Sequence, residues 1–154
     1  MLAKYDSLSV STPWAYKTYR EQCGHTFLDL CQDFHKTQTL EERKSRVHAD
    51  KMIEAVSEKN AVKVGTRLYN DLEKVVMPAR EKDTQLKAAM TDLSKQKGGL
   101  GTMMSGSGPT VFTLTDSLVQ AGAIQRDIRS HFNDPDLLVL IAPFNDHGIV
   151  VQPL

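Results

Sequence analysis

The sequence lacks the features that mark secreted, membrane-bound and nucleic-acid-binding proteins. Only two of its 154 residues are cysteines, Cys23 and Cys31, and without a CxxC motif they are typical of reduced thiols in a cytosol-like compartment. Nineteen Lys and Arg residues balance nineteen Asp and Glu residues, so the charge gives no reason to expect nucleic acid or an anionic membrane as a partner. The longest apolar run, residues 137–142, is far shorter than the ~20 residues of a membrane span. These absences predict a soluble, intracellular protein.

The start of the chain also lacks a recognisable leader. The first ten residues, MLAKYDSLSV, have neither the apolar core of a signal peptide nor the Arg- and Ser-rich character of a transit peptide. They become strand-like almost at once, without a polar lead-in. We therefore expect the chain to begin inside a fold, with an earlier half absent.

What the sequence does contain fits one α+β domain. Its length and its 40% of hydrophobic residues suffice for a single core. Short β-rich stretches predict strands at residues 2–3 and 8–10, 101–105, 111–115, 137–141 and 149–151. Amphipathic segments between them predict helices. Their order predicts a mainly antiparallel four-stranded sheet with helices packed on one face.

Capping residues predict where the helices begin and end. Ser11-Thr12-Pro13 predicts a helix start, because a hydroxyl can accept from the first N–H groups and proline tolerates the first helical position. Residues 24–38 have no period and predict a loop, and Thr39 with Glu42 forms a capping box that opens the next helix. Further helix starts are predicted at Asn60, Asp83 and Ser117, with a helix end at Gly98-Gly99, and Asn70-Asp71 favours a helix start over a metal site.

One stretch has an unusual composition. Residues 101–109 contain three glycines, two serines and a proline, with apolar residues close on both sides. Glycine allows positive φ and lets backbone N–H groups approach a ligand, so this loop could cradle an anion. It could equally be a hairpin turn in which glycine serves geometry only. The spacing matches neither the P-loop nor the dinucleotide fingerprint, so loop chemistry leaves both interpretations open.

Three stretches together resemble a known family. GGLGTMMSGSGPTVFTL, residues 98–114, resembles the third conserved motif of the GHMP kinases, which include galactokinase, homoserine kinase and mevalonate kinase. With LSVSTPWAYKTYREQ at residues 8–22 and NDLEKVVMP at residues 70–78, the chain looks like the C-terminal half of the 4-diphosphocytidyl-2-C-methyl-D-erythritol kinases of the cyanobacterial or plastid type. The resemblance runs over most of the chain, in the right order.

This resemblance implies a GHMP kinase C-terminal domain of ferredoxin-like fold over residues 1–154, with the N-terminal ATP-binding half absent. It implies ATP-dependent phosphorylation of the 2-hydroxyl of the cytidyl-diphosphate substrate in non-mevalonate isoprenoid biosynthesis. ATP and Mg²⁺ would serve the intact kinase, and neither is expected to bind tightly to this chain alone. The location would be the cytoplasm, or the plastid stroma for a plastidial parent enzyme.

The resemblance also assigns substrate-side residues. Tyr16 would stack on the cytosine, with Thr12 near the same end of the substrate; the alternative for Tyr16 is a core aromatic, which we also predict for Trp14 and Tyr19. A tight turn at the phosphate end of the cleft would be formed by Gly106, Ser107, Gly108 and Thr110. No catalytic residue is expected in this half. No metal-ligand spacing links the histidines, His25, His35, His48, His131 and His147.

Two other functions stay open at this point. The chain could be a freestanding, non-catalytic module that binds a cytidine nucleotide, or half of another GHMP kinase. Tyr16 argues against the latter, because homoserine and mevalonate offer no base to stack. The expected partners are the N-terminal half of the same kinase and the cytidyl-diphosphate substrate. Self-association is also expected, through an apolar face that the missing half would cover.

Overall fold

The computed structural model describes residues 1–23 and 49–146, which form an α+β domain. The elements in chain order are β1 (Leu2–Tyr5), a helical segment at residues 12–23, α3 (Asp50–Ser57), α4 (Ala61–Thr66), α5 (Glu73–Val76), α6 (Glu81–Gln96), β2 (Gly101–Met104), β3 (Val111–Leu114), α7 (Leu118–Phe132) and β4 (Leu137–Leu140). The loop expected at residues 24–38, the capping box at Thr39 and the strand expected at residues 149–151 lie outside the described residues.

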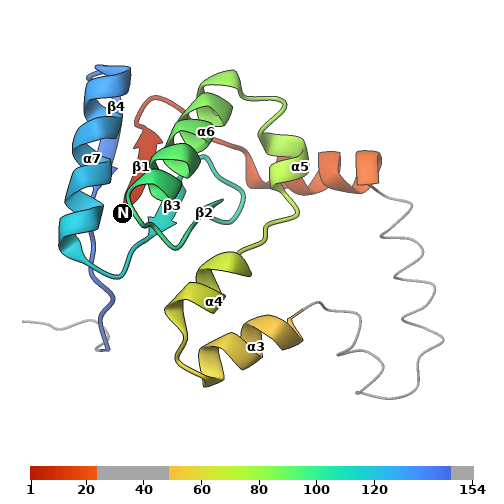
Figure 1. Cartoon of the computed structure of the whole chain (residues 1–154). Helices are drawn as coiled ribbons and strands as arrows, with labels where there is room; N and C mark the ends of the chain where they lie inside the picture. Colours follow the sequence, from red (N-terminus) through yellow and green to blue (C-terminus); the bar gives the residue numbers. More distant parts are fainter. Residues whose placement is uncertain (24–48, 147–154) are drawn as a thin grey trace, which may run out of the picture.

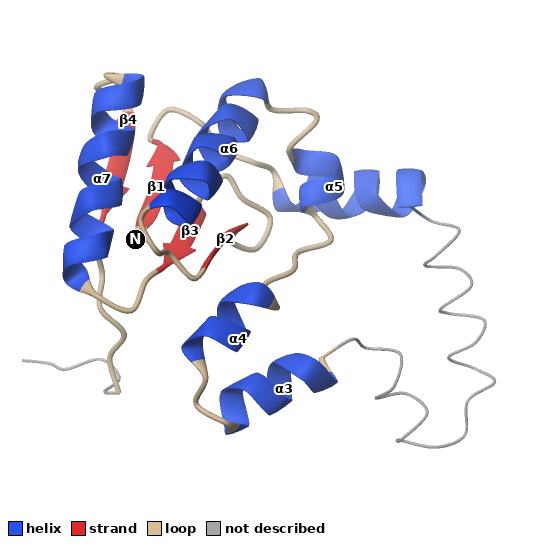
Figure 2. Ribbon diagram, in the orientation of Figure 1, coloured by secondary structure: helices blue, strands red, loops and turns tan. Residues whose placement is uncertain are grey.

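The strands form one antiparallel sheet in the order β2-β3-β1-β4 (Figure 2). Helices α6 and α7 cover one face of this sheet (Figure 1). The predicted four-stranded antiparallel sheet with helices on one face is therefore confirmed. Residues 8–10, expected to be strand-like, are not a strand. The chain turns after Tyr5, where the N–H of Leu8 donates to the Tyr5 carbonyl at 3.2 Å.

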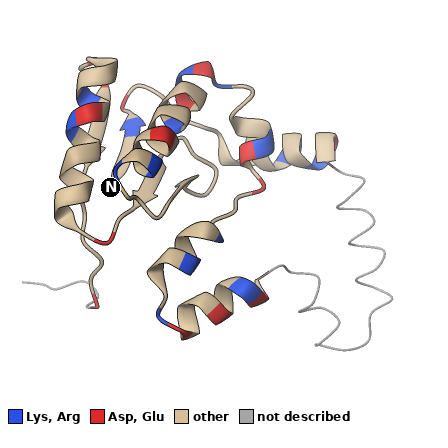
Figure 3. Ribbon diagram, in the orientation of Figure 1, with Lys and Arg blue, Asp and Glu red and all other residues tan. Residues whose placement is uncertain are grey.

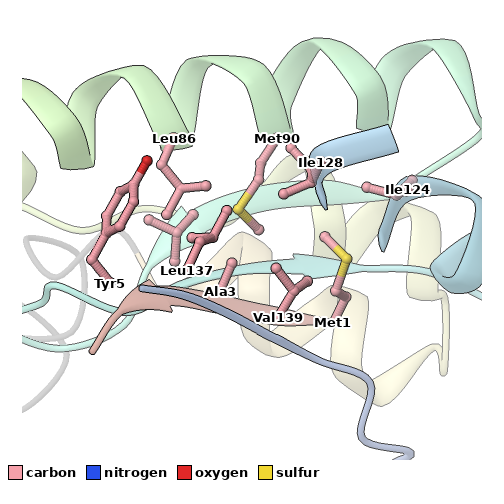
Figure 4. Packing of buried hydrophobic residues seen from close by; sticks show 10 residues of the cluster. Met1, Ala3, Tyr5, Leu86, Met90, Ile124, Ile128, Leu137 and Val139 are labelled. Atoms are coloured by element: carbon pink, nitrogen blue, oxygen red, sulfur yellow. The ribbon is translucent and has the colours of Figure 1, made fainter. Parts of the chain in front are cut away.

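The main hydrophobic core lies between the sheet and its two covering helices (Figure 4). Period-two alternation directs every second strand residue inward; in β4, Leu137 and Val139 are buried whereas Leu138 and Leu140 are exposed. We call this group the sheet core: Met1, Ala3, Tyr5, Leu86, Met90, Val111, Ile124, Ile128, Leu137 and Val139. Its regular spacing explains why the strands and the two long helices could be predicted.

A second, smaller cluster joins the helical segment 12–23 to α5 and to the end of β2. In Figure 1 this segment lies beside α5, away from α7. We call the group the site cluster: Ala15, Leu72, Val75, Val76, Met77 and Met104. Because Ala15 and Met104 are both fully buried in it, the helical segment is fixed against the end of β2. The site cluster thus positions the region that the glycine-rich loop occupies.

The helix starts predicted at Asn60 and Ser117 and the helix end predicted at Gly98 agree with the structure. Asn60 and Ser117 cap α4 and α7, each accepting a backbone N–H on its side chain. Gly98 follows α6 with φ +77°, the left-handed conformation typical of a glycine at a helix end. Helix α6 begins at Glu81 rather than at Asp83, whose buried carboxylate lies 3.3 Å from the Nε of Arg80.

Charged side chains of both signs are interspersed over the helices (Figure 3). Within residues 1–23 and 49–146, no helix combines the length and the apolar character that crossing a bilayer would require.

Candidate substrate-side site

A hollow of about 480 Å³ opens where the helical segment 12–23, the stretch before α5 and the β2–β3 hairpin meet. Two residues predicted for the site, Tyr16 and Gly106, line it together. The remaining lining residues are Tyr19, Tyr69, Asn70, Asp71, Leu72 and Met103. A larger, mainly apolar hollow of about 650 Å³ lies elsewhere, and none of the predicted site residues lines it. We therefore take the smaller hollow as the candidate site.

Tyr16 reaches the hollow because of how its helix starts and packs. The Ser11 hydroxyl accepts the N–H of Trp14 at 3.4 Å, and the buried methyl of Ala15 seats the helix on the site cluster. Tyr16 is 60% exposed, so it is not the core aromatic that stood as its alternative. Tyr19 packs on the site cluster and also lines the hollow.

Trp14, by contrast, is 37% exposed, and its prediction as a core aromatic was wrong. The buried face of this helix runs through Ala15, Tyr19 and Cys23, each four residues from the next. Trp14 falls outside that row. An aromatic residue beside a buried position was therefore not enough to identify the buried face.

Thr12 and Ser107 connect the start of the helix to the glycine-rich loop. Their hydroxyl oxygens lie 2.8 Å apart and share a hydrogen bond, although 95 positions separate them in the chain. The structure thus brings together two residues that were predicted for opposite ends of one substrate. Neither residue lines the hollow itself, so the bond joins the two segments beside it.

The glycine-rich loop is a hairpin between β2 and β3. The N–H of Ser105 donates to the Thr110 carbonyl at 2.8 Å, and the N–H of Gly108 donates to the Ser105 carbonyl at 2.9 Å. Gly106 and Gly108 have φ of +55° and +80°. A Cβ at Gly108 would lie 2.7 Å from the Met104 sulfur, whereas one at Gly106 would meet nothing within 4 Å.

Of the predicted loop residues, only Gly106 lines the hollow directly. Ser107 bonds to Thr12, and Gly108 lies over the side chain of Met104. Thr110 closes the hairpin through its carbonyl and does not line the hollow. The hairpin interpretation of this stretch is correct, and its geometry leaves room for a ligand role on the Gly106 side.

The prediction of Asn70 as a helix cap was wrong. Helix α5 begins at Glu73, with Leu72 in the N-cap position and no side-chain cap. The Asn70 Oδ1 accepts the N–H of Leu72 at 3.0 Å, which closes a local turn. Its Nδ2 donates to the carbonyls of Met104 and Gly106, both at 2.8 Å. Asn70 therefore ties the stretch before α5 to the glycine-rich hairpin.

Glu73 also ties α5 to the end of β2, and we did not predict this role from the sequence. Its Oε1 accepts the N–H of Met104 at 2.7 Å, and its Oε2 accepts from the Nζ of Lys87 at 2.6 Å. The partners are 31 and 14 residues away, so no local pattern could reveal them. The only local signal was the stretch NDLEK, which is polar except for its leucine and is followed by two buried valines.

Asp71 supplies the negative charge of the hollow. Its Oδ1 accepts from the Tyr69 hydroxyl at 2.7 Å and from the Nζ of Lys74 at 2.8 Å. Partial burial raises the pKa of this carboxyl, but hydrogen bonds from Lys74, Tyr69 and Tyr19 outweigh it and hold the pKa below its usual value. The pKa of the Tyr19 phenol is raised by burial and by the Asp71 carboxylate. At neutral pH the hollow therefore holds the ionised Asp71 carboxylate beside the neutral phenol of Tyr19.

The hollow suits a planar polar ligand more than a metal ion. Three tyrosines line it, and none of its described lining residues is Lys or Arg. Among residues 1–23 and 49–146, no three His, Cys, Asp or Glu side chains are grouped as metal ligands. His131 is the only histidine within those ranges; the other four and Cys31 lie outside the described residues.

One protein family and several kinases of the same name are similar to this chain. The family described as GHMP kinases C terminal matches residues 52–134. A 4-diphosphocytidyl-2-C-methyl-D-erythritol kinase of Gloeothece citriformis is 43% identical over 152 residues, which are 99% of this chain and 45% of the relative. The kinase of the same name from Microcystis aeruginosa is 45% identical over 151 residues, again 45% of its length. That of Synechocystis is 37% identical over 152 residues.

The chain thus spans less than half the length of these curated relatives, and it corresponds to their C-terminal part. No solved structure matches it.

Proposed function

The chain belongs to the GHMP kinase C-terminal family and is homologous to the C-terminal 45% of cyanobacterial 4-diphosphocytidyl-2-C-methyl-D-erythritol kinases, and from this we propose that it is the substrate-side domain of such a kinase. The kinase would transfer the ATP γ-phosphoryl group to the 2-hydroxyl of its cytidyl-diphosphate substrate, in non-mevalonate isoprenoid biosynthesis. The chain would be inactive alone.

The observation that carries this proposal is the meeting of two distant motifs at one hollow. Tyr16 and Gly106 line it together, and the Thr12–Ser107 hydrogen bond joins the segments that bear them. In the proposed complex the exposed ring of Tyr16 stacks on the cytosine, which is worth roughly 1–3 kcal/mol. The diphosphate then extends toward the glycine-rich hairpin. There Ser107 offers a hydroxyl donor, and the backbone of Gly106 borders open space, since a Cβ at that position would meet nothing within 4 Å.

The expected inactivity follows from what phosphoryl transfer needs. Catalysis depends on positioning and on cations that neutralise charge around the phosphates. None of the described residues that line the hollow is Lys or Arg. We propose that ATP and Mg²⁺ are held by the N-terminal part of the kinase, which is then the partner that this chain requires.

The open face of the sheet supports such a partner. Leu2 pairs with both Phe112 and Leu140, so these three side chains form an apolar row on the face that α6 and α7 leave uncovered. Leu140 is 62% exposed. We propose that the N-terminal part covers this row, and that the isolated chain self-associates through it. Sedimentation should show concentration-dependent association that Leu140→Gln weakens; a clean monomer at high concentration would contradict this.

The test of function is a coupled phosphoryl-transfer assay with the cytidyl-diphosphate substrate. The chain is assayed alone and then mixed with the N-terminal part of the Microcystis aeruginosa relative, expressed separately. We expect no turnover alone and measurable turnover on mixing. Turnover by the chain alone would contradict the proposed inactivity, and silence of a mixture in which the two parts demonstrably associate would contradict the proposed kinase role.

A second function, a non-catalytic cytidine-binding module, is favoured by one observation: the hollow is already formed by residues of this chain. Under this alternative the chain binds cytidine diphosphate, loses that binding in Tyr16→Ala, and gives no turnover when mixed. Turnover on mixing therefore separates the two functions, because binding that depends on Tyr16 is expected under both.

A further inference from the structure

Asn70 does not cap helix α5, and its contacts give it a different role. It is half-buried, it lines the hollow, and it sits between the aromatic side of the site and the glycine-rich hairpin. Its amide makes three hydrogen bonds: one from Oδ1 to the Leu72 N–H, and two from Nδ2 to the carbonyls of Met104 and Gly106. These use both amide hydrogens and the carbonyl oxygen, so the side chain is fully engaged.

The two carbonyls that Asn70 binds lie on either side of the bend where β2 becomes the loop. Met104 is the last residue of β2, and Gly106 is the first glycine of the turn, with φ +55°. Holding both carbonyls fixes the orientation of the Met104–Ser105 and Gly106–Ser107 peptide planes. Glu73 holds the same point from the other direction, because its carboxylate accepts the Met104 N–H.

Only asparagine supplies this pattern at that position. An aspartate has the same shape but no donor, so its carboxylate would face two carbonyl oxygens without a hydrogen between them. A serine has one donor and a shorter reach. The required residue is therefore set by donor chemistry rather than by size.

We propose that Asn70 is a positioning residue for the reaction: its amide holds the glycine-rich hairpin in the shape that the phosphate end of the substrate needs. This inference rests on the proposed kinase function. It assigns Asn70 to the phosphate end, through Gly106 and Ser107, whereas Tyr16 serves the cytosine end. Loss of the amide should therefore reduce turnover while cytidine recognition persists.

The matched pair of variants is Asn70→Asp and Asn60→Asp. Asn60 is an N-cap that uses only its Oδ1, which accepts the Lys63 N–H at 2.9 Å, and aspartate performs that role equally well. The same chemical change thus breaks two hydrogen bonds that the amide donates at residue 70 and none at residue 60. Should Asn70→Asp fail to fold, Asn70→Gln keeps the amide but displaces it by one methylene, and it takes the same place in the comparison.

The first readout is amide hydrogen exchange at Ser105 and Gly108 of the 154-residue chain, whose N–H groups close the hairpin. We expect exchange there to be faster by about tenfold or more in Asn70→Asp and unchanged in Asn60→Asp, because two hydrogen bonds that restrain the loop are lost. Unchanged exchange in Asn70→Asp would overturn the inference. This readout does not depend on any substrate.

The second readout is the mixed phosphoryl-transfer assay. We expect kcat to fall by about tenfold in Asn70→Asp with the KM for the cytidyl-diphosphate substrate changing by less than about twofold, and neither to change in Asn60→Asp. A raised KM with unchanged kcat, or no change at all, would overturn the inference while the kinase proposal stands. Silence of the unsubstituted chain would instead contradict the proposed function and, with it, the catalytic part of this inference.

Discussion

The sheet core and the site cluster of this molecule are built in different ways. The sheet core joins the strands β1, β3 and β4 and the two long helices through side chains in regular alternation. The site cluster joins a short helix, the four-residue helix α5 and one strand end, and hydrogen bonds from Asn70 and Glu73 secure it. The first depends on buried apolar area, and the second on a few polar contacts between residues that are distant in the sequence. Stability and site geometry should therefore respond to different substitutions.

The largest effect on stability is expected in the sheet core. Leu86 is fully buried, so Leu86→Ala should lower the free energy of unfolding by about 2–5 kcal/mol. The affinity of the folded protein for cytidine diphosphate should not change. Leu140→Ala is the matched control: it removes the same atoms from a 62% exposed position and should change stability by less than about 0.5 kcal/mol. Denaturant unfolding measures both, and equal losses would contradict the assignment of the core.

Alanine substitution at the two hairpin glycines, Gly106 and Gly108, should have different effects on stability. Gly108→Ala forces a left-handed residue with its Cβ 2.7 Å from the Met104 sulfur, so about 2–3 kcal/mol of stability should be lost. Gly106→Ala has the same kind of φ but open space, and it should lose only about 1–2 kcal/mol. Thermal unfolding of the two variants checks the order. The reverse order would show that the hairpin does not pack on Met104.

Substitution of Tyr16 should affect ligand binding but not stability. Tyr16→Ala should weaken binding of cytidine diphosphate by roughly 5- to 150-fold, the equivalent of 1–3 kcal/mol of stacking. Stability should hardly change, since the ring is 60% exposed. Trp14→Ala, on the same helix but outside the hollow, is the control and should leave the affinity unchanged. Calorimetric titration of the three proteins decides, and equal weakening in both variants would argue against stacking on Tyr16.

The smallest effect concerns Asp71 and pH. Its carboxyl pKa is lower in the folded protein than the unfolded value of about 3.9, so it stabilises the fold above that pH. This contribution disappears as the pH falls through the lowered folded pKa. Wild-type protein should therefore be slightly more stable than Asp71→Asn at pH 7, and the two should converge in acid. Urea unfolding at a series of pH values tests this prediction. A stability difference that grows in acid would contradict a lowered pKa of Asp71 in the folded protein.

The sequence allowed the sheet core to be predicted because its signals are local. The β-rich run at residues 137–140, a cap at Ser117 and a glycine after α6 each identify an element without knowledge of the rest. The site was harder to predict, since Asn70 and Glu73 act on carbonyl and N–H groups more than thirty residues away. The composition of the sequence singled out the glycine-rich stretch, but only the family resemblance assigned Tyr16 and Gly106 to a substrate site. Trp14 was placed wrongly because its helix carries three aromatic residues, and only Tyr19 lies in the row that packs inward.

The most direct test of the central claim is an NMR titration of the 154-residue chain with cytidine diphosphate. The account predicts that backbone signals of Tyr16 and Gly106 shift together and saturate, because both line the same hollow. Signals around the larger apolar hollow, such as those of Leu114 and Phe144, should stay in place. Shifts confined to Leu114 and Phe144, or no saturable shift at Tyr16 and Gly106, would contradict the claim that the helical segment 12–23 and the glycine-rich hairpin form one substrate site.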